Sequence, residues 1–436
     1  MNILGLSGCL LLAITVFGFT STASAAGDKN SAELMTGYPV PQALQVTAEN
    51  WLDYPNSNWS FWNLRQLLPT RVIARGAGPI SRLEQDPTDL LELRYDVDGT
   101  GVTVHEMLAG TDTNALVVLH QGRIVTEKYY HGMTPESPHL IMSLSKSLVG
   151  TLIGNLVDQD LLDTRKPAGF YIPELKGSAF EKASVRQLLD MSVAADRYEL
   201  TVVDDDTVFN HMDRLGQWRG NKKSSQAEGI YEFTAQAQPD GEHGKAFNYS
   251  GLNTEVLAWL AERVTGKHIS ELFSEQIWSK LGAEQDAYVT LGRDGTAFSE
   301  AGFNMTARDL ARVGQMVLQK GNYNGQQIVG RAWVEDLSTQ GSKKVWRGNP
   351  KNFVTQELDD AGFEQASYRS QWYSTGTENK EFFCIGYRGQ SLWIDPSNQV
   401  VIVKFSGWPE PHQADFPERW KKTWLGFQAI AESLGE

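Results

Sequence analysis

Apolar and polar positions predict β-strands in two parts of the chain that lie far apart in the sequence. Residues 115–130 hold two stretches rich in β-branched and aromatic residues with a glycine-containing turn between them, which predicts a β-hairpin. A second hairpin is predicted from one arm at 382–394, a turn at 395–398 and a second arm at 400–405. The last arm, Val-Val-Ile-Val-Lys-Phe, is almost wholly apolar, which is typical of a strand covered on both faces.

Between these hairpins the apolar residues recur at helical spacing. Residues 143–156 carry apolar side chains around most of the helix circumference, which predicts a buried central helix. Residues 252–264 and 307–318 are amphipathic, and Thr306 offers an N-cap to the second of them. Residues 420–434 place aromatic side chains on one face that can pack on a sheet. The pattern predicts an α/β protein of the α+β type, in which an antiparallel sheet closed by distant segments is flanked by helices and carries a mostly helical insertion.

The first 25 residues have the features of a secretory signal peptide. An uncharged apolar stretch at 3–19 is followed by small residues and by Ala23-Ser24-Ala25, which matches a typical cleavage site. The stretch is short for a membrane-spanning helix, which needs about 20 apolar residues. We therefore expect a signal peptide at 1–25 and export to the bacterial periplasm or the medium, with a retained anchor as the alternative.

The remainder divides into a lead-in and a main domain. Residues 26–103 are rich in Trp, Pro and Asn, and we expect them to form an extended N-terminal segment packed on the body of the protein. Residues 104–436 form the main domain. Within it we expect a sheet subdomain at about 104–157 and 285–436, and a helical subdomain at about 158–284.

Composition and charge narrow the classes of partner. The 436 residues include 39 Lys and Arg against 53 Asp and Glu, a formal net charge of −14, which argues against a protein that binds nucleic acid through its phosphates. The two cysteines exclude a disulfide-rich scaffold. Removal of the leader leaves only Cys384, which we expect to be a buried strand residue and not a second nucleophile. The expected partner is a small molecule, with no nucleic acid and no stable membrane anchor.

Several kinds of site lack their sequence signals. The eight histidines are scattered, without the spacing of metal ligands, and the acidic run at 204–206 lacks the alternation of a calcium loop, so it is expected to be a solvated loop. There is no phosphate-binding G-x-x-x-x-G-K-[ST] and no strand-linked G-x-G-x-x-G. The G-x-S-x-G turn of α/β-hydrolases is also absent. We therefore expect no metal and no cofactor.

The remaining chemical signal is an S-x-x-K motif formed by Ser143 and Lys146. At the first turn of a helix, residues i and i+3 share a face, which brings the lysine amine within reach of the serine hydroxyl. A serine hydroxyl needs such a base to become a nucleophile. Burial and the helix N-terminus are expected to push Lys146 towards its neutral form. A capping serine followed by a solvated lysine would give the same motif, but the helix that follows is apolar nearly all round.

Three segments together resemble a known family. Residues 143–150, Ser-Leu-Ser-Lys-Ser-Leu-Val-Gly, are similar to the first motif of the serine β-lactamase-like hydrolases, which include class C β-lactamases and penicillin-binding proteins. Residues 247–257 resemble the second motif, in which a tyrosine, here Tyr249, partners the Ser–Lys pair. Residues 386–396 resemble the third, on a sheet strand. From about residue 39 onwards the chain is most similar to the 6-aminohexanoate-dimer (nylon-oligomer) hydrolases, which implies a β-lactamase/transpeptidase-like fold.

The resemblance implies a role for each motif residue. Ser143 would attack a carbonyl carbon and form an acyl-enzyme, which water then cleaves. Lys146 and Tyr249 would together take the serine proton and return it to the leaving group. Tyr249 can do this only if a nearby cationic lysine lowers its pKa. The oxyanion hole would be formed by the backbone N–H groups of Ser143 and of Tyr387 on the third-motif strand.

Departures from the family pattern bear on the substrate. Class C β-lactamases carry Y-x-N, whereas Gly251 stands two residues after Tyr249, and the triplets S-D-N and K-T-G are absent. Arg388 occupies a position where relatives often have histidine; it is expected to reach solvent, or alternatively to face an anionic substrate end. Tyr198 and Asn304 are further candidates for the substrate pocket.

These observations favour an amidase or esterase of small linear substrates. Two alternatives stay open at this point. One is a D-amino-acid peptidase or weak β-lactamase that acts on cell-wall-like substrates, and the other is a non-catalytic relative that binds such ligands. The intact set of Ser143, Lys146 and Tyr249 argues against the last, because a binding protein does not need all three.

Overall fold

The computed structural model describes residues 31–195, 208–218, 227, 229–350, 352–409 and 416–435. The predicted signal peptide lies outside these residues, as do the acidic run at 204–206 and Tyr198. Within the described ranges, no helix combines the length and the apolar character needed to cross a bilayer.

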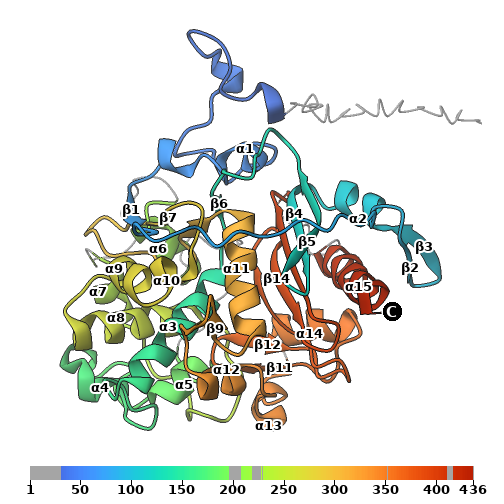
Figure 1. Ribbon diagram of the computed structural model, residues 1–436. Coiled ribbons are helices and arrows are strands. Elements are labelled where there is room, and N and C mark those ends of the chain that lie inside the picture. Colours follow the sequence, from blue (N-terminus) through green and yellow to red (C-terminus); the bar gives the residue numbers. More distant parts are fainter. Residues whose placement is uncertain are drawn as a thin grey trace, which may run out of the picture.

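A seven-stranded antiparallel sheet forms the centre of the right-hand half in Figure 1. Its order is β11-β12-β13-β14-β15-β4-β5, so β4, early in the chain, pairs with β15 near the C-terminus. The predicted closure of one sheet by distant segments is confirmed. The strands are β4 (Thr113–His120), β5 (Arg123–Tyr129), β11 (Ser367–Arg369), β12 (Trp372–Ser374), β13 (Phe382–Gly386), β14 (Gln390–Asp395) and β15 (Val400–Ser406).

The first predicted hairpin is confirmed as β4 and β5, which pair from Ala115 opposite Tyr129 to His120 opposite Arg123. Gln121 and Gly122 both have positive φ, 50° and 79°. Two successive left-handed residues form the kind of two-residue turn that matches the twist of the flanking strands.

The second predicted hairpin is wrong in its first arm. Residues 382–394 do not form one strand, because the chain reverses after β13 and returns as β14. Arg388 and Gly389 have φ of 63° and 91°, so a tight turn stands inside a run that reads as continuous in sequence. The last arm is confirmed: every residue of β15 is buried.

Helices cover both faces of this sheet, as Figure 1 shows. α11 (Ala307–Leu318) crosses one face, against β4, β14 and β15. α15 (Phe416–Gly435) lies on the other face, together with α2 (Val104–Gly110) and α14 (Phe353–Asp360). Thr306 caps α11 by accepting the backbone N–H of Asp309, as predicted. Each helix therefore buries one apolar face on the sheet.

The other half of the molecule is helical. Between β6 (His139–Leu140) and β7 (Ala287–Thr290) the elements of the described residues are helices. α3 (Leu144–Asp158) is the central one: all its residues from Leu144 to Leu156 are buried, as its apolar circumference predicts. The other α-helices of this half are α4 (Ala168–Tyr171), α5 (Val185–Leu189), α6 (Val208–Leu215), α7 (Ile230–Thr234), α8 (Gly251–Thr265), α9 (Ile269–Phe273) and α10 (Ser279–Leu281).

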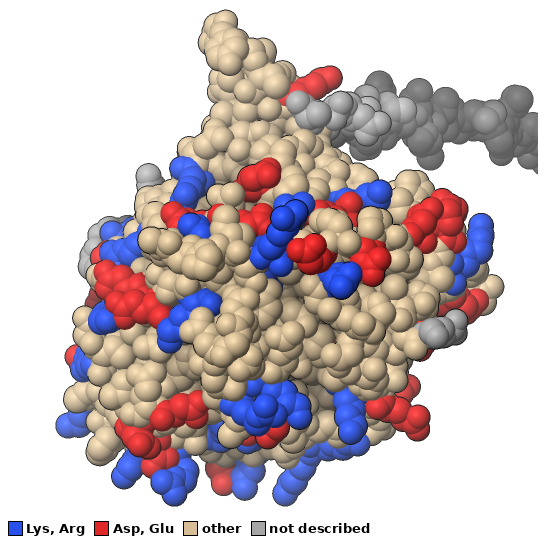
Figure 2. Space-filling view, viewed as in Figure 1, with Lys and Arg blue, Asp and Glu red and all other residues tan. Residues whose placement is uncertain are grey.

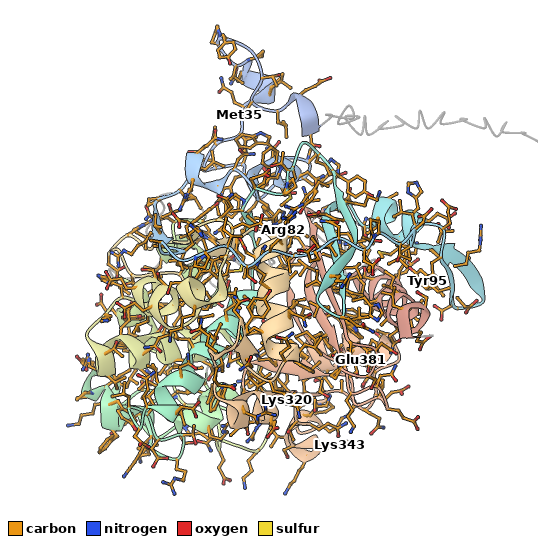
Figure 3. The ribbon with its side chains drawn as sticks, viewed as in Figure 1. Met35, Arg82, Tyr95, Lys320, Lys343 and Glu381 are labelled. Atoms are coloured by element: carbon orange, nitrogen blue, oxygen red, sulfur yellow. The ribbon has the colours of Figure 1, made fainter. Side chains whose placement is uncertain are left out.

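The segment before β4 is spread over the whole molecule. It contributes β1 (Thr70–Ile73) to a small sheet of order β1-β7-β8-β6, in which β8 is Phe303–Met305. Residues 74–93 then cross in front of α11, where Arg312 donates to the carbonyl of Ser81 (Figure 1). Arg82, labelled in Figure 3, lies on this crossing segment. The segment ends in the hairpin of β2 (Arg94–Val97) and β3 (Thr100–Thr103) beside α15.

Acidic and basic side chains interleave on the face shown in Figure 2. The projection at the top of that view belongs to the N-terminal segment and is almost free of charge, because residues 36–48 include no Lys, Arg, Asp or Glu. The distribution on this face offers no extended area of one sign.

Candidate active site

Ser143 lies where the chain leaves β6 and enters α3. Met142, directly before it, has φ of 51°, and a left-handed backbone at a residue other than glycine is strained. This bend turns the chain into α3 and places Ser143 at the N-cap position. Its side chain makes no capping hydrogen bond and is half-buried. The hydroxyl is therefore not used to cap the helix, which removes the structural explanation for the S-x-x-K motif.

Lys146 turns back towards this serine from the first turn of α3. Its Nζ donates to Oγ of Ser143 at 3.0 Å. Nζ also donates to the backbone carbonyl of Glu300 at 3.0 Å and to Oε2 of the same residue at 3.1 Å. The side chain of Lys146 is only 3% exposed, so the ammonium is held inside the protein and is not solvated.

The charge state of Lys146 differs from the sequence prediction. Burial does push the pKa of Lys146 down, but the opposing effects of Tyr249, Glu300 and Glu255 outweigh it and raise the pKa above its usual value of 10.5. The expectation that this lysine is neutral is therefore wrong. The largest opposing effect comes from Tyr249 and the next from Glu300, a buried carboxylate that belongs to none of the motifs.

Tyr249 lies just before α8, and its ring lies beside the ammonium of Lys146. The centre of its ring lies 5.3 Å from Nζ of Lys146, within the range of a cation–π contact. The residue is 8% exposed and packs among aromatic residues, with the ring centre of Phe247 at 6.3 Å. The structure thus brings the three motif residues Ser143, Lys146 and Tyr249 together from the two ends of a 106-residue span, as the resemblance implies.

The third motif reaches the site through a close backbone approach. A Cβ added to Gly386 would lie 2.3 Å from the carbonyl of Ile141 and 2.9 Å from Cβ of Met142. Only glycine lets the end of β13 lie this close to the segment that precedes Ser143. Tyr387 follows as the first residue of the turn, directly after the strand and not on it, and its side chain is half-buried.

The other candidate residues have different surroundings. Arg388 is 1% exposed and donates from Nη1 to the carbonyl of Trp408 at 3.0 Å, so the expectation that it reaches solvent is wrong. Arg388 lies in the β13–β14 turn with a left-handed backbone, φ 63°. Asn304 is fully buried on β8 and donates from Nδ2 to the carbonyl of Gly302 at 2.8 Å, and its place in the pocket stays a prediction. Tyr198 lies outside the described residues.

Cys384 is buried on β13, as predicted. Burial raises the pKa of its thiol, which opposes formation of the thiolate that a nucleophile needs. In the part of the chain that the structure describes, no three His, Cys, Asp or Glu side chains gather as metal ligands would.

Sequence reasoning missed Glu300 and Glu255. Glu300 lies in the turn before β8 and binds Lys146, while Glu255 on α8 accepts the backbone N–H of Glu300 through Oε1 at 2.8 Å. The one visible signal was Gly251 in place of the asparagine of Y-x-N, because a Cβ there would lie 1.4 Å from Oε2 of Glu300.

Comparisons with known proteins identify the family of the chain. Residues 103–422 match the Beta-lactamase family. The chain is 38% identical over 379 residues to a 6-aminohexanoate-dimer hydrolase of Paenarthrobacter ureafaciens, covering 86% of this chain and 91% of that protein.

Solved structures show the same fold. A protein of Bacillus anthracis described as a candidate 6-aminohexanoate-dimer hydrolase superposes with a TM-score of 0.79 at 30% identity, over 89% of this chain and 97% of its own. A candidate β-lactamase of Bacteroides dorei, at 20% identity, has a TM-score of 0.54 over 70% of this chain and 88% of its own, which supports the fold alone. The chain therefore belongs to the β-lactamase family, has the β-lactamase/transpeptidase-like fold and is a hydrolase.

Proposed function

We propose that this hydrolase cleaves amide or ester bonds of small linear substrates through an acyl-enzyme on Ser143. The observation that supports this most strongly is the contact of Lys146 Nζ with Ser143 Oγ at 3.0 Å, beside the ring of Tyr249 at 5.3 Å. A half-buried serine in contact with a buried ammonium, which itself lies beside a tyrosine ring, has what an activated nucleophile requires.

Acylation uses each of these groups in turn. Oγ of Ser143 attacks the carbonyl carbon while its proton passes to the phenolate oxygen of Tyr249, and the carbonyl oxygen takes the negative charge. The backbone N–H groups of Ser143 and Tyr387 would bind this oxyanion, helped by the N-terminus of α3. When the bond to the leaving group breaks, Tyr249 returns the proton to the leaving nitrogen or oxygen, and an ester on Ser143 remains.

Deacylation runs the same transfers with water. Water attacks the ester carbonyl and loses a proton to Tyr249, and the proton then returns to Oγ of Ser143 as the acid is released. Besides the substrate, one water molecule is consumed in each cycle. The cycle therefore needs only the three motif residues, the oxyanion donors and water.

The substrate class follows from the relatives and from the second motif. The Paenarthrobacter relative is named for the 6-aminohexanoate dimer, a linear amide, which makes that compound the first substrate to test. The space that the asparagine of Y-x-N would occupy is taken by Glu300, so a β-lactam is the less favoured substrate. The leader-like residues 1–25 support action after export, in the periplasm or the medium.

The test is a panel of substrates with one variant and one control. The mature protein is incubated with the 6-aminohexanoate dimer, p-nitrophenyl acetate and butyrate, nitrocefin and a fluorophosphonate probe. We expect turnover of the linear amide or the esters, and probe attachment to Ser143. The Ser143→Ala variant should lose both, whereas Ser397→Ala, at an exposed serine in the β14–β15 turn, should keep both. Turnover of nitrocefin far above the linear substrates would contradict the proposed substrate class.

A further inference from the structure

The partner that holds Lys146 is a buried carboxylate outside all three motifs. Oε2 of Glu300 lies 3.1 Å from Nζ of Lys146, and the two side chains are 2% and 3% exposed. The backbone carbonyl of Glu300 accepts a second hydrogen bond from the same Nζ at 3.0 Å. A buried ammonium is tolerated only when an opposite charge and hydrogen bonds compensate its loss of water. Glu300 supplies both.

Glu300 occupies a defined space in the second motif. A Cβ on Gly251, the first residue of α8, would lie 1.4 Å from Oε2 and 2.1 Å from Cδ of Glu300. A side chain at position 251 would therefore displace this carboxylate from its present place. The chain fills, from the turn before β8, the space that an asparagine at the third position of Y-x-N would enter.

We infer that Glu300 is a positioning residue of this active site, which fixes Lys146 against Ser143 from the space that Gly251 leaves open. The inference rests on the proposed function, because it assigns Glu300 a part in the acylation of Ser143. It acts through Lys146 and does not itself touch the substrate.

A second buried carboxyl group, that of Glu255, contacts Glu300. Its Oε1 accepts the backbone N–H of Glu300 at 2.8 Å, and its side chain is fully buried. Burial, and then the negative charge of Glu300, raise the pKa of Glu255 well above its usual range. The ionisable groups that face Lys146 are thus Tyr249 just before α8, Glu255 on α8 and Glu300 before β8. Of the two carboxylates, Glu300 forms the salt bridge with the ammonium, at 3.1 Å.

This arrangement assigns the proton transfers. With Glu300 beside it, Lys146 carries its full set of protons and has no lone pair to accept another. Tyr249 therefore takes the proton of Ser143, and the ammonium of Lys146 stabilises the phenolate that this requires. The active form has Lys146 charged. Loss of the Glu300 charge would lower the pKa of Lys146, because burial would then act with less opposition.

The first experiment compares Glu300→Gln, Glu300→Asp and a matched control. The control is Glu381→Gln: Glu381, labelled in Figure 3, is also fully buried, but it precedes β13 and bonds to Thr375 and Gln428. It is separated from Gly386 by about 17 Å of strand. The rate of fluorophosphonate attachment to Ser143 is measured from pH 6 to 11, together with the melting temperature.

We expect Glu300→Gln to acylate about 100-fold more slowly, the lower range of what acid–base catalysis contributes. Its alkaline limb should move to lower pH, since a lysine without its counter-charge loses its proton earlier. Glu300→Asp, which keeps the charge, should acylate at a rate between those of the wild type and Glu300→Gln. Glu381→Gln should match the wild type in rate and pH profile. A purely structural role of Glu300 would lower the melting temperature without moving the alkaline limb, and that result would overturn the inference.

The second experiment removes the side chain at position 300 and introduces one at position 251, so that the polar partner of Lys146 comes from α8. Glu300→Ala and Gly251→Asn should each be slow, the first because Lys146 loses its partner and the second because the new side chain meets Glu300. The double variant should acylate at least about tenfold faster than either, because the asparagine can then reach Lys146 through the vacated space. A double variant no faster than Glu300→Ala would contradict the inference.

The two experiments distinguish failure of the inference from failure of the proposed function. If the wild type itself does not react at Ser143, the proposed function fails and the inference with it. If the wild type and Glu300→Gln both react normally, the inference alone is refuted.

Discussion

Replacing Lys404 by methionine is expected to stabilise the protein at neutral pH and to have little effect at pH 10. Lys404 lies on β15, fully buried, with Nζ 2.5 Å from Oγ of Ser406 and 5.4 Å from the ring centre of Trp408. Burial lowers the pKa of Lys404 from 10.5 to about 7, while the charges of Asp112 and Arg419 act in opposite directions. A lysine that is hard to protonate in the folded state weakens folding wherever the unfolded chain binds the proton.

The size and sign of the effect follow from this difference in pKa. Above pH 10.5 the amine is neutral in both states and there is no loss. As the pH falls from 10.5 to 7, the unfolded state takes up the proton first, and the free energy of unfolding decreases by about 1.4 kcal/mol per pH unit. At pH 7 the loss is roughly 4 kcal/mol, and at pH 10 it is below about 1 kcal/mol. Methionine removes this loss but also removes the hydrogen bond to Ser406, worth about 1 kcal/mol.

The assay is urea unfolding of the wild type and Lys404→Met at one-unit steps from pH 6 to 10. We expect the variant to be more stable by about 3 kcal/mol at pH 7 and equal within about 1 kcal/mol at pH 10. Lys320→Met serves as the control: Lys320, labelled in Figure 3, is exposed on the surface, so its stability difference should not change with pH. A constant difference between the wild type and Lys404→Met over this range would refute the reasoning.

Two further substitutions test how closely the helices pack. Gly154→Ala on α3 should lower the free energy of unfolding by about 1–3 kcal/mol, because the new Cβ would lie 2.2 Å from the indole of Trp333. Gly110→Ala, where the new Cβ would meet nothing closer than 3.9 Å, should not destabilise, and equal losses in the two alanine variants by urea unfolding would count against the packing described. Thr306→Ala should cost about 1 kcal/mol through loss of its bonds to Asp309, while Thr306→Ser should keep most of the stability; a threonine-to-alanine change without cost would argue against this cap.

The fold was predictable where a long segment places its apolar residues at regular helical spacing. The helices at 143–156, 252–264 and 307–318 correspond to α3, α8 and α11 within one or two residues at each end. Short strands carry too few residues to show a period, so the four-stranded sheet of β1, β7, β8 and β6 was not predicted. The turn inside 382–394 was missed because Gly386 and Gly389 by themselves do not define a turn, and the left-handed backbone of Arg388 has no sequence signal.

The site was predictable as far as its motifs are local. Ser143 and Lys146 are three residues apart on one helix, so their contact follows from helical spacing. Glu300 is 154 residues from Lys146, and only the tertiary structure brings its carboxylate there. The same gap explains why the charge of Lys146 was predicted wrongly. A pKa depends on partners in space, and the sequence around Ser143 shows only burial and the helix N-terminus.

The most direct test of the central claim is to trap the acyl group during turnover. The mature protein is mixed with p-nitrophenyl butyrate, quenched in acid within the first turnover, and digested for mass spectrometry. We expect a burst of nitrophenol equal to the enzyme concentration and one butyryl group on the peptide that contains Ser143, both absent from Ser143→Ala. A butyryl group on another residue, or undiminished turnover by Ser143→Ala, would contradict the claim.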